Sequence, residues 1–128
     1  MMVVIEEYDK QIEDLRKAGQ PYFKANVDEA NYTLFMAYAL SREDGKSHLD
    51  ISRGIESREV EGIVRILREK GIKEFTISNS GNGIVDVLAK FEECGARMKG
   101  LTKVETNRPA PYGASGHEVL NAFRMEIE

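Results

Sequence analysis

Two amphipathic segments that flank one short β-like run most constrain how this chain can fold. Their apolar residues recur at spacings of three and four: Val60, Ile63, Val64 and Leu67 in the first, and Ile84, Val87, Leu88 and Phe91 in the second. Between them, Phe75 and Ile77 share one face of a strand predicted over residues 73–78. Helix, strand and helix with glycines at the joints predict βαβ units with parallel crossover connections.

The same patterns predict where these elements begin and end. Ser57 is a good helix cap, and Gly71 is a natural stop, so the first helix is predicted over residues 57–70 and the second over 83–94. Three further strands are predicted from polar and apolar alternation, with the first at an edge of the sheet and the last two antiparallel. They span residues 47–53, 98–106 and 119–127. The last of them is expected at the end of the sheet.

Two more helices are predicted before residue 46. Ile5, Tyr8, Ile12 and Leu15 form a narrow apolar stripe over residues 5–18. A second helix is predicted to begin at Asn26, with Glu29 completing a capping box, and to run toward Gly45.

That second helix is apolar all round from residue 34 to residue 40. It therefore either lies between other elements or forms a subunit interface, because such a helix has no face suited to water. The candidate interaction residues on it are Leu34, Phe35 and Tyr38.

Length and composition favour a single domain. The chain has 128 residues, of which 41% are hydrophobic and 31% charged, as in ordinary globular proteins. We expect an α/β or α+β fold over residues 1–128, with a helical part at 1–45 and an α/β part at 46–128. Two N-terminal helices would pack with a small mixed sheet of three or four strands in βαβαββ order.

Charge and cysteine content limit the classes of binding partner and the cellular compartment that we expect. The net charge of −4 and the lack of a long basic block make nucleic acid an unlikely partner. No apolar run is long enough to cross a membrane, and the N-terminus does not resemble a signal peptide. A single cysteine suits a reducing compartment, so we expect a cytoplasmic protein.

The loop after the predicted strand 73–78 is a candidate ligand site. Its residues are Ser78, Asn79, Ser80, Gly81, Asn82 and Gly83. A glycine-rich turn that opens a helix offers backbone N–H groups to an anion. However, the spacing is only G-x-G, and Asp86 in the following turn would repel an anion. The alternative is that Ser80 or Asn82 caps the helix and the glycines only permit the turn.

Catalytic and metal-binding sets are weak. Cys94 lies at the end of an apolar helix, where a small buried side chain is expected, and His48 and His117 are far from it in sequence. Neither His48 with Asp50 nor His117 with Glu118 has a recognised metal-ligand spacing. We therefore expect no catalytic residues, metal or cofactor, and lean against an enzyme.

The segment 107–116 is the second candidate for function. Two prolines and two glycines mark it as a loop. Tyr112, between Pro111 and Gly113, would present an aromatic ring at the tip, where it could anchor a protein partner. The alternative is a hairpin connection without a role of its own.

The second half of the chain resembles a known family. The segments that carry the resemblance are IKEFTIS at 72–78, the helix end at 94–95, GLTKV at 100–104 and AFRM at 122–125. They are similar to small uncharacterised proteins carried on conjugative elements of Gram-positive gut bacteria, over roughly residues 32–127. The resemblance implies a mobile-element cargo protein, and such cargo includes inhibitors of host defence.

These observations lead to two functional hypotheses. The first is a non-enzymatic accessory protein that binds an unknown protein partner through the second helix or the Tyr112 loop, with self-association as one form of that interaction. An inhibitor of host defence is a variant of it. The second is a small-ligand or nucleotide-phosphate domain, including an enzyme, that uses Ser78 to Gly83.

Overall fold

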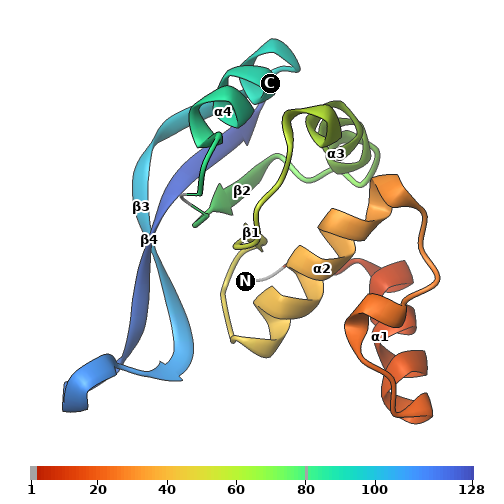
Figure 1. Cartoon of the computed structure of the whole chain (residues 1–128), viewed down its shortest axis with the longest axis vertical. Coiled ribbons are helices and arrows are strands. Elements are labelled where there is room, and N and C mark those ends of the chain that lie inside the picture. Colours follow the sequence, from red (N-terminus) through yellow and green to blue (C-terminus); the bar gives the residue numbers. More distant parts are fainter. Residues whose placement is uncertain (1–2, 80) are drawn as a thin grey trace.

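The computed structural model describes residues 3–79 and 81–128, and within them the chain has an α+β fold of four helices and a four-stranded mixed sheet (Figure 1). The elements follow in the order α1 (Glu6–Ala18), η1 (Tyr22–Lys24), α2 (Glu29–Glu43), β1 (Asp50–Ile51), α3 (Ser57–Glu69), β2 (Glu74–Ile77), α4 (Ile84–Glu93), β3 (Ala96–Pro109), η2 (Pro111–Gly113) and β4 (His117–Ile127). The predicted fold class and the βαβαββ order are confirmed.

The sheet is mixed, with the strand order β1-β2-β4-β3. β1 and β2 are parallel neighbours joined through α3, as the crossover prediction requires. β4 pairs antiparallel with both β2 and β3, so it lies between the two strands that α4 connects. β2 and β3 therefore run in the same direction without touching. The prediction that 119–127 lies at the end of the sheet is wrong, because β4 pairs on both sides and is a central strand.

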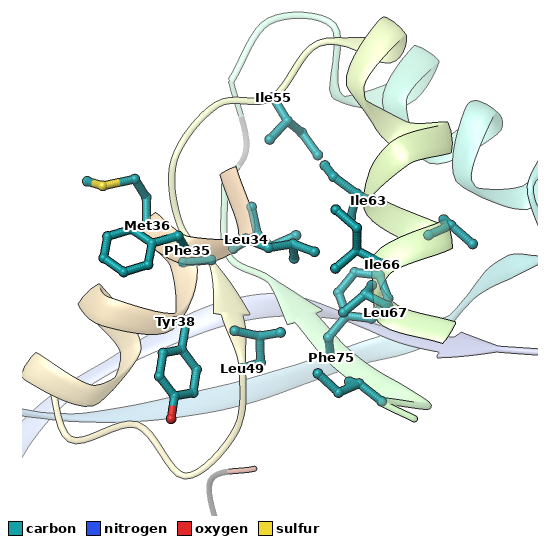
Figure 2. Packing of buried hydrophobic residues seen from close by; sticks show 14 of the residues in the cluster. Leu34, Phe35, Met36, Tyr38, Leu49, Ile55, Ile63, Ile66, Leu67 and Phe75 are labelled. Carbon is teal, nitrogen blue, oxygen red and sulfur yellow. The ribbon is translucent and has the colours of Figure 1, made fainter. Parts of the chain in front are cut away.

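The core lies between α3, α4 and one face of this sheet, and it continues into α2. Phe75 of β2 packs on Phe91 of α4 with 5.5 Å between ring centroids, and Met125 beside it on β4 is fully buried. Figure 2 shows Ile63, Ile66 and Leu67 of α3 pointing toward this face, which buries the stripe that the sequence predicted.

The apolar part of α2 lies between other elements. Leu34 is 2% exposed, and Phe35 and Tyr38 are 0% exposed (Figure 2). Tyr8 of α1 packs edge-on against Phe35, with ring centroids 5.6 Å apart. Of the two alternatives for this helix, the structure has the buried one. In the described part of the chain, no helix combines the length and apolar character needed to cross a membrane.

Two predicted helix caps are wrong by one or two residues. α2 is capped by Asp28, whose Oδ1 accepts a hydrogen bond of 2.8 Å from the N–H of Asn31. Asn26 lies earlier, because the turn η1 and the extended residues after it postpone the helix start. α3 is capped by Glu56 rather than Ser57, since Glu56 and Glu59 form a reciprocal capping box.

The strand lengths also differ from the predictions. β1 covers only Asp50–Ile51 of the predicted 47–53, whereas β3 continues to Pro109 and β4 starts at His117. Proline is tolerated in β3 because this strand lies at the sheet edge, where a backbone donor is not required. Within the predicted loop 107–116, residues 107–109 belong to β3, whereas residues 110–116 form the connection, as predicted.

Candidate functional site

The β3–β4 hairpin is the most prominent feature of the molecule. Its two strands stay paired from Ala96 and Ile127 near α4 to Pro109 and His117 at the far end. Figure 1 shows its distal half reaching away from the helices, with η2 at the tip. In this distal half β3 and β4 pair only with each other, and their register shifts between Glu105 and Pro109.

Tyr112 occupies the tip. Its side chain is fully exposed, with a relative accessibility of 105%. Its backbone has φ 58° and ψ 31°, and it is the single non-glycine residue with positive φ in the described part of the chain. This left-handed conformation costs a bulky residue about 1–2 kcal/mol. The ring thus contributes no packing to the fold and occupies a disfavoured backbone position.

Polar contacts hold the hairpin to the C-terminal end of α2. Arg108 places one guanidinium nitrogen 2.8 Å from Asp44 Oδ2 and another 2.6 Å from Glu118 Oε1. Asn107 donates its backbone N–H to the carbonyl of Asp44 at 2.8 Å and its side-chain N–H to the carbonyl of Glu43 at 3.0 Å. The hydrogen bond to Glu118 raises the pKa of Arg108, which therefore stays charged. We call these contacts the Arg108 clasp.

Polar groups of the loop 78–83 form hydrogen bonds within the protein. Ser78 donates its hydroxyl to Asp50 Oδ2 at 2.7 Å, and the N–H of Gly81 donates to Asn79 Oδ1 at 3.0 Å. Gly83, with φ 83°, is the N-cap of α4 and provides no side-chain cap, so the prediction that Asn82 caps this helix is wrong. Ser80, the other predicted cap, lies outside the described residues. An anion at this loop would have to displace the Asn79 contact.

Sequence reasoning missed a buried polar cluster below that loop. Lys46 Nζ lies 2.7 Å from Asp50 Oδ2, and the two side chains are 1% and 0% exposed. Thr76 Oγ1 donates to Asp50 Oδ1 at 2.7 Å. Ser41 donates its hydroxyl to the carbonyl of Asp50 and accepts from its N–H. In the sequence, Asp50 stands at an ordinary polar position of the alternating strand pattern, so no local signal marked it as buried. The Asp50 carboxylate is paired with Lys46 and accepts hydrogen bonds from Thr76 and Ser78. We therefore interpret this cluster as a structural link between α2, β1 and β2.

The structure does not bring the predicted interaction residues together. Leu34, Phe35 and Tyr38 lie in the core, whereas Tyr112 lies in η2 at the hairpin tip. The Tyr38 hydroxyl donates to Asp9 Oδ1 at 2.7 Å and accepts from Arg42 at 2.7 Å. Burial raises the pKa of Tyr38. These side chains of α2 stabilise the fold and are not available at the surface.

The weaker catalytic and metal candidates are also apart. His48 Nδ1 contacts the hydroxyl of Ser47 at 2.9 Å, and His117 Nδ1 lies 3.7 Å from Glu105 Oε1. Neither imidazole pairs with Cys94 in the described structure, where Cys94 is half-buried at the end of α4. Within residues 3–79 and 81–128, no group of three or more His, Cys, Asp or Glu side chains is placed to hold a metal ion.

Comparison with known proteins identifies a family. No curated protein and no solved structure matches the chain. One family model, that of a domain of unknown function named DUF7698, matches residues 33–127, from the first turns of α2 to the end of β4. The predicted membership of an uncharacterised family over this part of the sequence is confirmed, and the chain belongs to the DUF7698 family.

Proposed function

We propose that this protein is a non-enzymatic accessory protein that binds a protein partner through the hairpin tip, with Tyr112 as the anchor. The observation that carries the proposal is the state of Tyr112, which is fully exposed and held in the left-handed region. Glycine or asparagine would adopt that conformation at lower cost. A tyrosine there is better explained by a contact with another molecule than by the fold.

The surroundings of the tip support the same role. Tyrosine is among the residues that most often dominate binding energy at interfaces, because it supplies a large rigid surface and one polar group. The Arg108 clasp fixes the base of the distal hairpin, which lowers the conformational entropy that binding would otherwise have to remove.

The proposal also includes the cellular compartment in which the partner is found. The sequence resembles proteins of conjugative elements of Gram-positive gut bacteria, which supports a cytoplasmic partner in the host cell. A component of a host defence system is one such partner.

Photo-crosslinking from the tip tests the proposal and does not require the partner to be identified first. A benzophenone amino acid is placed at Tyr112 in the full chain, and at Phe23 as the control, because Phe23 is an aromatic residue of η1 with 61% exposure. After irradiation in lysate of the source cells, we expect a discrete adduct from position 112 that excess unlabelled protein competes away. Position 23 should not give it.

A substitution at Tyr112 distinguishes specific binding by the hairpin tip from non-specific adhesion. Tyr112→Gly removes the ring and suits the positive φ, so the variant should fold with equal or higher stability. We expect this variant to compete at least tenfold less effectively for the adduct than the unsubstituted chain. Equal competition by both proteins, or the same adducts from positions 112 and 23, would refute the proposal.

A further inference from the structure

The face of the sheet opposite the helices holds a pocket of about 150 Å³. It lies where the segment before β1 approaches β2, β4 and β3. The polar residues that line it are Ser47, His48, Glu74, Thr76, Thr102, Lys103 and Arg124. This pocket is distinct from the hairpin tip and from the loop 78–83.

Arg124 is one of the basic residues that line the pocket, and it is exposed to solvent. Strand register places it opposite Thr76 of β2 on one side and opposite Gly100 of β3 on the other. Its neighbours in β4, Phe123 and Met125, pair with the core residues of β2, so Arg124 points to the opposite face. Gly100 has no side chain, and nothing lies within 4 Å of the place where its Cβ would be, so the position opposite Arg124 on β3 is open.

The guanidinium of Arg124 has no hydrogen-bond or ion-pair partner among the described residues. Arg108 and Arg58 each bind two carboxylates, and Arg68 binds two backbone carbonyls. Arg53 and Arg65 resemble Arg124 in having no such contact in the described structure, but neither lines this pocket. An unpaired fork of five N–H donors in a pocket is suited to a planar or tetrahedral oxyanion, which it can bind through two parallel hydrogen bonds.

We infer that this pocket binds a small oxyanion, a carboxylate or a phosphate, with Arg124 as its anchor. The hydroxyls of Thr102 and Ser47 line the same pocket and are of the kind that complete such a site. Lys103 also lines the pocket, but its Nζ already contacts the side chain of Asn121, its partner in the register, so it adds little.

Glu74 limits the charge of the ligand. Its carboxylate lines the pocket two residues from Thr76 and has no partner within the described structure. Diagonal neighbours on adjacent strands are about 7–8 Å apart, so Glu74 weakens the positive potential at Arg124 without neutralising it. A small anion with one or two charges suits the pocket better than a polyanion.

Titration by heteronuclear NMR tests this inference, with inorganic phosphate and succinate as the two probes at constant ionic strength. We expect saturable shifts of the amides at 47–48, 100–102 and 124 for one probe or both. The probe that saturates at lower concentration identifies the preferred oxyanion. Sodium chloride at the same ionic strength should not reproduce the shifts.

Charge substitutions make the test specific to the pocket. Arg124→Gln should weaken binding at least tenfold, because it removes charge-assisted hydrogen bonds. Glu74→Gln should strengthen it about two- to threefold, because it removes a nearby negative charge. Arg65→Gln and Glu69→Gln change the net charge equally at exposed positions of α3 that do not line the pocket, and they should leave the affinity unchanged.

Three results would overturn the inference. They are shifts that do not saturate, shifts that chloride reproduces, and equal losses of affinity in Arg124→Gln and Arg65→Gln. Thr102→Val provides a further check that conserves the volume of the side chain. It should weaken binding if the hydroxyl contacts the ion, and its amide spectrum shows directly whether the sheet is intact.

Discussion

Lys46 and Asp50 form an ion pair that is almost completely removed from water. We expect Lys46→Met to lower the free energy of unfolding by about 3 kcal/mol, because it leaves a buried carboxylate without its counter-ion. Thr76 and Ser78 still donate to that carboxylate, which keeps the cost at the lower end of the range for broken buried pairs. Urea denaturation measures the change.

The matched control for this pair lies on the surface of α1. Arg16 and Glu13 are 3.3 Å apart with side chains 72% and 49% exposed, so Arg16→Met should cost less than about 0.5 kcal/mol. A cost below about 1 kcal/mol for Lys46→Met would show that the buried pair does not hold the joint between α2, β1 and β2.

Tyr8 makes stability sensitive to alkaline pH. Its ring is 2% exposed, its hydroxyl donates to Asn31 Oδ1 at 2.6 Å, and burial raises its pKa above the ordinary value for tyrosine. The unfolded chain therefore loses this proton first. Stability from the neutral phenol is fully present below about pH 10 and is lost as the pH rises above that value.

Tyr8→Phe should reduce this pH dependence. We expect the free energy of unfolding of the unsubstituted protein to fall more steeply between about pH 9 and about pH 11 than that of the variant, measured by urea denaturation at each pH. The pKa values of Tyr22 and Tyr38 are also raised, so part of the decrease in stability with pH remains in both proteins. Parallel curves for the two proteins would contradict the assignment to Tyr8.

Individual residues also show which features could be predicted from the sequence and which could not. The place of Tyr112 at a loop tip follows from its proline and glycine neighbours and agrees with the structure. The Asp50 cluster does not follow from any local pattern, because Ser41 on α2 and Thr76 on β2 are separated from Asp50 by 9 and 26 residues. The unpaired state of Arg124 likewise depends on which strands flank β4.

At the scale of elements, β3 is an open edge of the sheet. It has 14 residues, and Lys99 and Lys103 project charge along it, a common way to block pairing with another chain. We expect the double substitution Lys99→Val and Lys103→Val to cause self-association that increases with concentration, measured by sedimentation velocity. The exposed side chains of Met98 and Leu101 would become part of the new contact.

The charge-matched control for this edge lies on α1. Lys10→Gln with Lys17→Gln removes the same two charges from exposed positions far from the sheet edge. This control should sediment like the unsubstituted protein. Equal association in both double variants would assign the effect to net charge instead of strand pairing.

Helices are predicted more accurately than strands for a physical reason. The stripe on α3 repeats within one element, so it can be read from 13 consecutive residues. Strand ends depend on partners: β1 stops at Ile51 because β2 offers it only two paired residues, and β3 continues to Pro109 because His117 pairs with it. The insertion of β4 between β2 and β3 is a contact between distant segments that no local repeat encodes.

At the scale of the whole molecule, the Arg108 clasp joins the projecting hairpin to the helical body. We expect Arg108→Gln with Asn107→Ala to increase amide hydrogen exchange at residues 105–119 about tenfold or more, since local opening then loses its main restraint. Global stability should change by less than about 1 kcal/mol, because the Arg108 side chain is 43% exposed and its ion pairs are partly screened.

Arg97 provides the control at the other end of β3. Its guanidinium lies 3.5 Å from Glu128 and is 55% exposed, so Arg97→Gln removes a similar surface contact near α4. Exchange at 105–119 should not change in this variant. Equal acceleration in both variants would show that the distal hairpin opens independently of its contact with α2.

The central position of β4 has a consequence for synthesis on the ribosome. Residues 117–127 join β2 to β3, so the four-stranded sheet cannot assemble until residues 117–127 have left the exit tunnel. Until then the nascent chain carries β2 and β3 with unpaired sides and an uncovered apolar face, a condition that favours chaperone binding. A chain that stopped before residue 117 would contain α1 to α4 but would lack β4, the strand that joins β2 to β3.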